Sequence, residues 1–341
     1  MSLIKNIIFA PNVHTGGGLE LLKPLLMLSS RVKVGFVLDE RARSKMSGFI
    51  QENAAFFNPT IIGRFKAELE LFNYRGADEV LCFHNLPPLL PFNGRISVFF
   101  QNVNILDSSG LVGGNIRVYI RSLLERSIFK IFRGRVNRFY VQTPSVKQLL
   151  VEKGEISPDK IIVFPFNTQN KVSNSERQGD RDGFVYVADG ISHKNHFNLI
   201  EAWSLLSRQG YYPELKLTLG ECDALLWSKL KLIINEQGLN VVNVGHLSFS
   251  EIETLYKSSE ALIFPSLKES FGLPLIEAGS YGLPVIAPEL DYVRDVCRPV
   301  ETFNPLSARS IEQAVRRFKG WGDDRVNMSN PEEFLHQVFH N

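Results

Sequence analysis

The segment from residue 264 to residue 288, FPSLKESFGLPLIEAGSYGLPVIAP, constrains the fold of this chain more than any other. The apolar run 261–264 leads into it, and the apolar run 285–287 lies near its end. Runs of this kind, bounded by turn residues, are typical of buried parallel strands. Between them, Pro274 suits the first turn of a helix, where the missing backbone N–H would have no partner anyway. The segment therefore predicts a strand–loop–helix–strand unit, in which ligands bind at the carboxyl ends of the strands.

Two carboxylates lie on either side of the predicted helix start. Glu269 is in the loop, Glu277 is in the helix, and the backbone amides of Gly272 and Leu273 lie between them. Amides at a helix N-terminus attract an anion such as a phosphate. An isolated pair of glutamates at this spacing is usually a capping residue and a surface residue, but the glycines, the proline and the flanking strands favour a site. The arrangement suits a nucleotide sugar, with one acid accepting hydrogen bonds from the ribose and the other from the sugar.

Residues 269–278, ESFGLPLIEA, followed by residues 282–287, GLPVIA, resemble the E-x7-E signature of the family-4 glycosyltransferases. Members of that family are retaining enzymes with the GT-B fold. The resemblance implies that Glu277 binds the ribose and that Glu269 acts catalytically at the sugar. It implies donor contacts for the following residues of the segment: Glu269, Phe271, Gly272, Leu273 and Glu277.

The resemblance implies an enzyme that transfers a hexose from a nucleotide sugar to a saccharide acceptor, in O-antigen, lipopolysaccharide or other surface-polysaccharide biosynthesis. Two alternatives stay open. A nucleotide-sugar epimerase on the same scaffold would need an acid–base pair in the cleft. A non-catalytic protein would only bind the nucleotide sugar, although the intact Glu269, Glu277 and Lys194 argue against a loss of activity.

Apolar runs alternate with helical patterns along the chain, which predicts an α/β fold with parallel sheets. A chain of 341 residues is too long for one ordinary core and long enough for two. Residues 167–182, NTQNKVSNSERQGDRD, contain almost no apolar side chain and are interpreted as a polar linker. We therefore expect two Rossmann-like domains of the GT-B type, an acceptor-side domain over residues 1–166 and a nucleotide-sugar-binding domain over residues 183–320. On the family pattern, a C-terminal helix in residues 321–341 crosses back to the first domain.

A glycine-rich loop follows the first predicted strand, residues 4–10. Gly16, Gly17 and Gly18 would let the backbone approach a ligand closely, although a plain flexible turn is the alternative interpretation. The family resemblance implies that this loop faces the diphosphate and the sugar of the donor.

Lys194 lies in a loop between a predicted strand and a predicted helix, where its ammonium group can meet a phosphate. On the family pattern this lysine binds the donor diphosphate and acts in catalysis. The family arginine falls on Asp189, so one phosphate-binding cation is missing from its usual place. His193 or His196 would replace it, or these histidines simply cap and pack.

Four further residues follow from the resemblance. The base of the nucleotide is expected near the loop that contains His246. The acceptor side is expected at His14, Gln101 and Asn102. Gln101 and Asn102 stand where family members commonly carry a His-Asp pair, so no ionisable catalytic group is assigned there.

We expect neither a metal nor a cofactor besides the donor. The departing diphosphate would be stabilised by Lys194, the glycine-rich loop and the helix N-terminus. Residues 180–182, Asp-Arg-Asp, spell the D-x-D metal-binding motif of another glycosyltransferase fold, but they lie in the polar linker with no predicted strand before them. Retention by same-face attack, with the leaving phosphate taking the acceptor proton, is the family's common explanation and requires no nucleophile–base pair.

Residues 115–138 combine helical spacing of apolar residues with seven cations and a single acid, Glu125. Such a basic amphipathic helix suits an anionic membrane surface or a polyanionic partner, and an ordinary core-facing helix with a solvated basic face is the alternative. The pattern predicts a cytoplasmic protein held peripherally at the inner face of the membrane, with an acceptor linked to undecaprenyl diphosphate. The cations are Arg117, Arg121, Arg126, Lys130, Arg133, Arg135 and Arg138.

Composition and cysteine count bear on the possible partners, the redox state of the thiols and membrane insertion. A formal net charge of +2 gives no support for a nucleic-acid partner. Cys82, Cys222 and Cys297 are odd in number and widely separated, which indicates reduced thiols. The first apolar run breaks at Pro11 and predicts a strand, not a signal peptide, and no run is long enough to span a bilayer.

Overall fold

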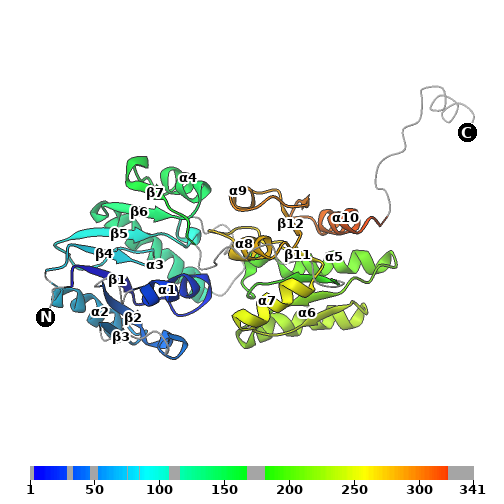
Figure 1. Ribbon diagram of the computed structural model, residues 1–341, viewed down its shortest axis with the longest axis horizontal. Coiled ribbons are helices and arrows are strands. Elements are labelled where there is room, and N and C mark those ends of the chain that lie inside the picture. Colours follow the sequence, from blue (N-terminus) through cyan, green and yellow to red (C-terminus); the bar gives the residue numbers. More distant parts are fainter. Residues whose placement is uncertain are drawn as a thin grey trace, which may run out of the picture.

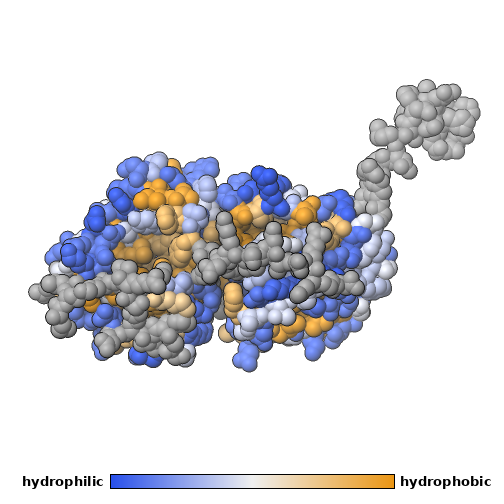
Figure 2. All heavy atoms as spheres, in the orientation of Figure 1, coloured by the Kyte–Doolittle hydropathy of each residue, from blue (hydrophilic) through white to orange (hydrophobic). Residues whose placement is uncertain are grey.

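The computed structural model describes residues 4–28, 34–46, 53–74, 76–83, 85–106, 116–166 and 181–321. These residues form two wholly parallel sheets, each covered by helices (Figure 1). The predicted α/β fold with two Rossmann-like units is confirmed. On the face shown in Figure 2, hydrophilic residues predominate along the outer margin of each domain, and hydrophobic residues are visible within the face of each domain.

The first domain is built on a seven-stranded sheet. Its strands are β1 (Asn6–Ala10), β2 (Val34–Asp39), β3 (Ala54–Phe57), β4 (Glu79–Cys82), β5 (Arg95–Phe99), β6 (Arg138–Val141) and β7 (Ile161–Val163). Their order is β3-β2-β1-β4-β5-β6-β7. The winding direction therefore reverses between β1 and β4, and in open parallel sheets ligands bind at the carboxyl ends of the strands at such a reversal. The helices are α1 (Gly16–Leu28), α2 (Ile61–Asn73), α3 (Ile116–Phe132) and α4 (Pro144–Glu152).

The second domain is built on a six-stranded sheet. Its strands are β8 (Phe184–Tyr186), β9 (Leu215–Leu217), β10 (Val241–Asn243), β11 (Ala261–Ile263), β12 (Val285–Pro288) and β13 (Glu301–Phe303). Their order, β10-β9-β8-β11-β12-β13, reverses between β8 and β11. The helices are α5 (His196–Arg208), α6 (Ala224–Glu236), α7 (Phe249–Ser258), α8 (Leu273–Ser280), α9 (Asp291–Arg294) and α10 (Ala308–Lys319).

Alternate residues of β1 belong to two separate hydrophobic clusters. Ile7 and Phe9 belong to one cluster, and Ile8 and Ala10 belong to the other. Successive side chains of a strand point to opposite faces, so the first sheet is buried on both sides, as a parallel sheet requires. The second domain has a core of its own, in which Trp203 of α5 packs edge-on against Phe184 of β8.

The two domains touch beside the cleft. α9 lies opposite α4 in Figure 1, and the carboxylate of Asp295, which follows α9, accepts a hydrogen bond of 3.1 Å from the backbone N–H of Ser145 at the start of α4. A carboxylate at a helix N-terminus is favourable electrostatically. This contact fixes one edge of the space between the sheets.

Several predicted segments lie partly or wholly outside the described residues. Of the predicted linker, the structure describes Arg181 and Asp182, and the C-terminal segment beyond residue 321 is not described. The Arg181 guanidinium donates to the carbonyl groups of Tyr281 and Gly282, just after α8. Arg181 is thus occupied in joining the linker to the second domain. None of the helices described combines the length and apolar character that crossing a membrane requires.

A buried ion pair lies between α2 and the first sheet. Arg64 and Glu68 approach to 3.0 Å, and the Glu68 side chain is 1% exposed. The other Glu68 carboxylate oxygen accepts hydrogen bonds from the backbone N–H groups of Leu89 and Leu90. The Arg64 guanidinium also lies over the ring of Phe9. Glu68 therefore joins α2 to the loop that precedes β5.

We expect Glu68→Ala to lower the free energy of unfolding by about 3 kcal/mol, because removing one partner leaves a buried guanidinium uncompensated. Glu70→Ala changes a partly exposed glutamate on the same helix, which accepts a hydrogen bond from Asn73, and should cost less than about 0.5 kcal/mol. Urea-induced unfolding of both variants measures the difference. Equal losses in the two variants would mean that the buried pair contributes nothing specific.

Candidate active site

A cavity of about 410 Å³ lies where the reversal points of the two sheets face each other. Loops after β1, β4 and β5 and the helix α3 form its first-domain wall, and loops after β8 and β11 form its second-domain wall. Of the residues predicted from the sequence, those on the cavity surface are Gly16, Gly17, Gly18, Gln101, Asn102 and Glu269. Those off the cavity surface are His14, Lys194, His246, Phe271, Gly272, Leu273 and Glu277.

The starts of α1 and α8 lie against each other across the cleft, and Figure 1 shows the two helices adjacent at the centre of the molecule. A Cβ atom on Gly17 would lie 3.2 Å from a methyl carbon of Leu273. Gly16 has φ +66° and Gly272 has φ +72°, values that favour glycine. Both helices therefore begin beside the cleft, where unpaired N-terminal amides favour an anion.

Lys194 and Glu269 join the two loops of the second-domain wall. The lysine Nζ lies 2.6 Å from the Glu269 Oε1, and the side chains are only 14% and 12% exposed. The backbone N–H of Leu267 donates to the carbonyl of His193 at 2.8 Å and connects the same loops again. Glu269 reaches the cavity surface, whereas Lys194 lies behind it.

Glu277 lies near the first domain, within α8. The Tyr256 hydroxyl donates a hydrogen bond of 3.1 Å to its carboxylate. Burial raises the pKa of Glu277 and the charge of Glu20 on α1 raises it further, while the Tyr256 hydrogen bond opposes the increase. Glu277 is therefore a partly buried carboxylate with a fixed orientation, close to the opposite domain.

Asp189 and two histidines surround Lys194. Asp189 is accessible from the cavity, and desolvation by the protein around it raises its pKa. Burial lowers the pKa of His193 and of His196 to about 4, and the Lys194 charge contributes in both cases. The His196 ring packs against Tyr186, and its Nε2 atom is buried without a hydrogen-bond partner. With pKa values this low, both histidines are neutral near neutral pH in the ligand-free protein, which favours the packing role over the cationic one.

The acceptor-side residues Gln101 and Asn102 are held by Asn85, which has the left-handed φ of +73°. The Asn85 side-chain carbonyl accepts hydrogen bonds from the backbone N–H groups of both residues. The Gln101 amide donates to the carbonyl of Phe83, and Arg126 of α3 donates to the carbonyl of Ile105. This wall is therefore rigid and rich in neutral amide groups.

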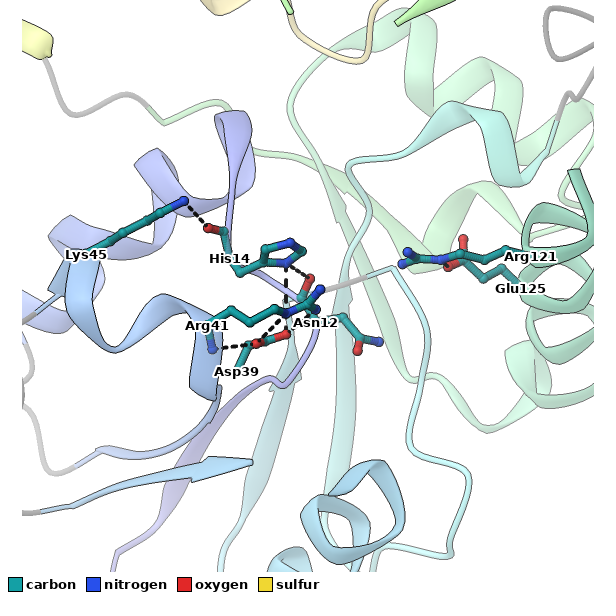
Figure 3. A network of polar contacts seen from close by, with 7 residues as sticks. All are labelled: Asn12, His14, Asp39, Arg41, Lys45, Arg121 and Glu125. Atoms are coloured by element: carbon teal, nitrogen blue, oxygen red, sulfur yellow. Dashed lines mark hydrogen bonds and ion pairs between the residues drawn. The ribbon is translucent and has the colours of Figure 1, made fainter. Parts of the chain in front are cut away.

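His14 belongs to a neighbouring network on the first domain (Figure 3). Its Nδ1 lies 3.4 Å from the carbonyl oxygen of Asn12 and 3.9 Å from the buried carboxylate of Asp39. Arg41 pairs with that carboxylate at 2.6 Å, and Lys45 donates to the His14 carbonyl. Burial lowers the pKa of His14. His14 thus helps to shape the end of β1 without reaching the cavity surface.

Arg121 and Glu125 line the cavity, although the sequence did not assign them to the site. They lie one turn apart on α3, and the Arg121 Nε donates to the Glu125 carboxylate at 2.8 Å. Both line the cavity, and Figure 3 shows the pair apart from the His14 network. The sequence grouped Arg121 with the basic face of residues 115–138. Its spacing of four residues from Glu125 was the available signal for a separate role.

His246 and Phe271 both lie off the cavity surface, one exposed and one buried. His246 is exposed after β10, in a loop held by the Asn243 side chain, which bonds both backbone groups of Leu219. Phe271 is buried. The part of the chain that the structure describes holds no group of three or more His, Cys, Asp or Glu side chains suited to a metal ion.

The low pKa of His196 predicts acid sensitivity. Because the folded state binds a proton more weakly than the unfolded state, stability should fall as the pH drops below the unfolded value of about 6.5. We expect His196→Asn to remove about 1 to 2 kcal/mol of the loss in unfolding free energy between pH 7 and pH 5. Urea unfolding at both pH values measures it. The same change at exposed His246 should leave the pH dependence intact, and an unaltered pH dependence in His196→Asn would contradict the assignment.

Comparison with known proteins gives a family match for the second half of the chain. The model for glycosyl transferases group 1 matches residues 167–331. The O-antigen chain mannosyltransferase RfbU of Salmonella typhimurium is 26% identical over 215 residues, which cover 63% of this chain and 58% of that protein. The O-antigen chain mannosyltransferase B of Escherichia coli is 28% identical over 115 residues, covering 33% of this chain and 30% of its own length.

Solved structures match over almost the whole chain. Alr3699/HepE of Anabaena, in complex with UDP and glucose, superposes with a TM-score of 0.67 at 14% identity, covering 92% of this chain and 91% of its own. The apo form of the lipopolysaccharide outer core galactosyltransferase WaaB gives a TM-score of 0.59 at 16% identity, covering 93% and 90%. The predicted resemblance to surface-polysaccharide glycosyltransferases is confirmed. The chain has the GT-B fold, and its residues 167–331 match the model of the group 1 glycosyl transferases.

Proposed function

We propose that this chain is a retaining glycosyltransferase that transfers a hexose from a nucleotide sugar to a saccharide acceptor in cell-surface polysaccharide biosynthesis. The observation that carries the proposal is the cavity between the two domains, with Glu269 on one wall and amide side chains on the other. Relatives named as O-antigen mannosyltransferases support the reaction class, although the chain spans only 58% of the length of RfbU. These relatives favour a glycosyltransferase over a nucleotide-sugar epimerase and over a non-catalytic nucleotide-sugar-binding protein.

In this proposal the second domain binds the donor. Glu277, oriented by Tyr256, accepts hydrogen bonds from the ribose hydroxyls. Glu269, held by Lys194, accepts from the sugar hydroxyls. The facing N-termini of α1 and α8 stabilise the charge that develops on the leaving diphosphate, since preorganised donors act most strongly in a desolvated cleft.

The acceptor lies against Gln101 and Asn102, whose amide groups suit neutral hydroxyls. Its hydroxyl oxygen forms a bond to the anomeric carbon on the face from which the diphosphate departs. The carbon–oxygen bond to the diphosphate breaks, and a diphosphate oxygen takes the hydroxyl proton. Configuration is thereby retained without a second carboxylate acting as nucleophile, and we propose that the step needs neither a metal nor a cofactor.

The test is incubation with UDP-glucose, UDP-galactose, UDP-N-acetylglucosamine and GDP-mannose in the presence of EDTA. We expect one donor to release its nucleoside diphosphate and to glycosylate a lipopolysaccharide-derived saccharide with retained anomeric configuration, as read by NMR. An isomerised nucleotide sugar would indicate an epimerase, and binding without turnover would indicate a non-catalytic protein. Activity that needed added magnesium or manganese would overturn the metal-independent mechanism.

Glu277→Ala should raise the dissociation constant for the nucleoside diphosphate by roughly tenfold or more, since a buried hydrogen bond to a charged group contributes about 1.5–3 kcal/mol. Glu269→Ala should leave that constant nearly unchanged and lower turnover of the intact donor, because its contact is with the sugar. Calorimetry and donor-turnover assays measure the two effects. Glu236→Ala, an exposed position at the end of α6, is the control. Equal losses of affinity in the two site variants would refute the division of roles.

A second proposal concerns α3. Its outer face carries exposed Lys130 beside exposed apolar side chains, of which Ile131 is 71% exposed. Arg126 and Arg133 are bonded within the first domain, and Arg121 lines the cavity, so fewer cations face outward than the sequence suggested. We propose that this face docks on the anionic inner surface of the membrane, where an undecaprenyl-diphosphate-linked acceptor presents its saccharide to a cytoplasmic, peripheral enzyme. The exposed apolar residues are Ile120, Leu123, Leu124 and Ile131.

The variant Leu124→Ser/Lys130→Glu/Ile131→Ser should lose co-sedimentation with anionic vesicles at low salt, because each juxtamembrane cation contributes about 1 kcal/mol and the apolar contacts add to it. The matched control, Leu225→Ser/Lys229→Glu/Leu232→Ser, changes an equally exposed set on α6. It should sediment like the unaltered protein. Neutral vesicles and high salt should abolish sedimentation. If the unaltered protein does not co-sediment with anionic vesicles at low salt, α3 is an ordinary solvated helix.

A further inference from the structure

The loop between β11 and α8 places a second lysine on the cavity. Lys268 lies on the second-domain wall beside Asp189, His193 and Glu269. Its positive charge contributes, after burial and the Lys194 charge, to the low pKa of His193. The sequence did not assign Lys268 any role in the site.

The charges of this wall leave a diphosphate with a deficit of cations. Lys194 is bound to Glu269 at 2.6 Å and lies off the cavity surface. His193 is neutral near pH 7. Asp189 places a carboxyl group at a position where a cation would bind a phosphate better. On the second-domain wall, as far as the described residues show it, Lys268 is the cation that reaches the cavity.

The backbone of Lys268 is firmly anchored. The Ser266 hydroxyl contacts the carbonyl oxygens of Lys268 and His193 at 3.2 and 3.3 Å. The Tyr292 hydroxyl donates to the Ser266 carbonyl at 2.7 Å, and the Leu267 N–H donates to the His193 carbonyl. The backbone of Lys268 is therefore fixed on the second-domain wall, four residues before Gly272, the N-cap of α8.

We propose that Lys268 binds the diphosphate of the donor as a further cation of the site, beside Lys194, which also holds Glu269 in position. The assignment rests on the proposed function, because it takes a nucleoside diphosphate as the ligand. A lysine acts as a point charge and needs no bidentate geometry, so a flexible side chain on a rigid loop is sufficient for phosphate. Ammonium and helix amides would then act together on the leaving group.

The test compares Lys268→Gln, Lys268→Arg and the exposed-site control Lys229→Gln. Calorimetry gives dissociation constants for UDP, GDP, ADP and dTDP, and for the nucleoside of whichever binds. Lys268→Gln should weaken the nucleoside diphosphate by about tenfold or more, as expected for a charge-assisted hydrogen bond, and leave the nucleoside unaffected. Lys268→Arg should restore most of the affinity, and Lys229→Gln should match the unaltered protein. Inorganic pyrophosphate should compete less well with the nucleoside diphosphate for binding to the Lys268→Gln variant than for binding to the unaltered protein.

Two outcomes would overturn the assignment. One is an unchanged diphosphate affinity in Lys268→Gln, and the other is an equal loss for diphosphate and nucleoside, which would indicate a general disturbance of the loop. Melting temperatures of the unliganded variants separate such a disturbance from a local charge effect. Failure of the unaltered protein to bind any of the four nucleotides would overturn the proposed function, and the assignment with it.

Discussion

The contact between Lys194 and Glu269 is the interaction on which the arrangement of the site depends. It joins the loops after β8 and β11, the two strands between which the second sheet reverses its winding direction. Charge-assisted hydrogen bonds are stronger than neutral ones, and this one is largely shielded from solvent. Because α8 begins a few residues after Glu269, the pair also sets where the N-terminus of that helix points. The backbone bond from Leu267 to His193 reinforces the same junction.

The two walls of the cavity differ in chemistry. The first-domain wall carries the neutral amides of Gln101 and Asn102 and one internally paired ion pair, Arg121 with Glu125. The second-domain wall carries the charged side chains of Asp189, Lys268 and Glu269. Amide groups both donate and accept hydrogen bonds and so suit sugar hydroxyls, while fixed charges and helix amides suit phosphate. The proposed division between acceptor domain and donor domain follows from this difference. The domain contact through Asp295 and α4 keeps the walls facing each other.

The order of long apolar runs was sufficient to predict most of the fold. Strands such as β1 and β11 are continuous buried runs, and their alternation with helices leaves little choice beyond parallel sheets. The short strands β3 and β13 were not predicted. Each forms an edge of its sheet and is half-buried along most of its length. β13 has one apolar residue in three, whereas β3 is a run of four apolar residues that the sequence did not identify as a strand. Helix α2 and the short α9 were also not anticipated.

The sequence by itself determined the two-sheet architecture, the strand–loop–helix–strand unit around Glu269 and Glu277, and the glycines at the starts of α1 and α8, because these depend on local periodicity and backbone conformation. Only the tertiary structure decided which side chains reach the cavity. It placed Lys194 behind Glu269, turned His14 toward Asp39, and brought Arg121, Glu125 and Lys268 to the cavity surface. Those positions depend on how distant loops and helices pack against one another, and a linear pattern carries no record of that packing.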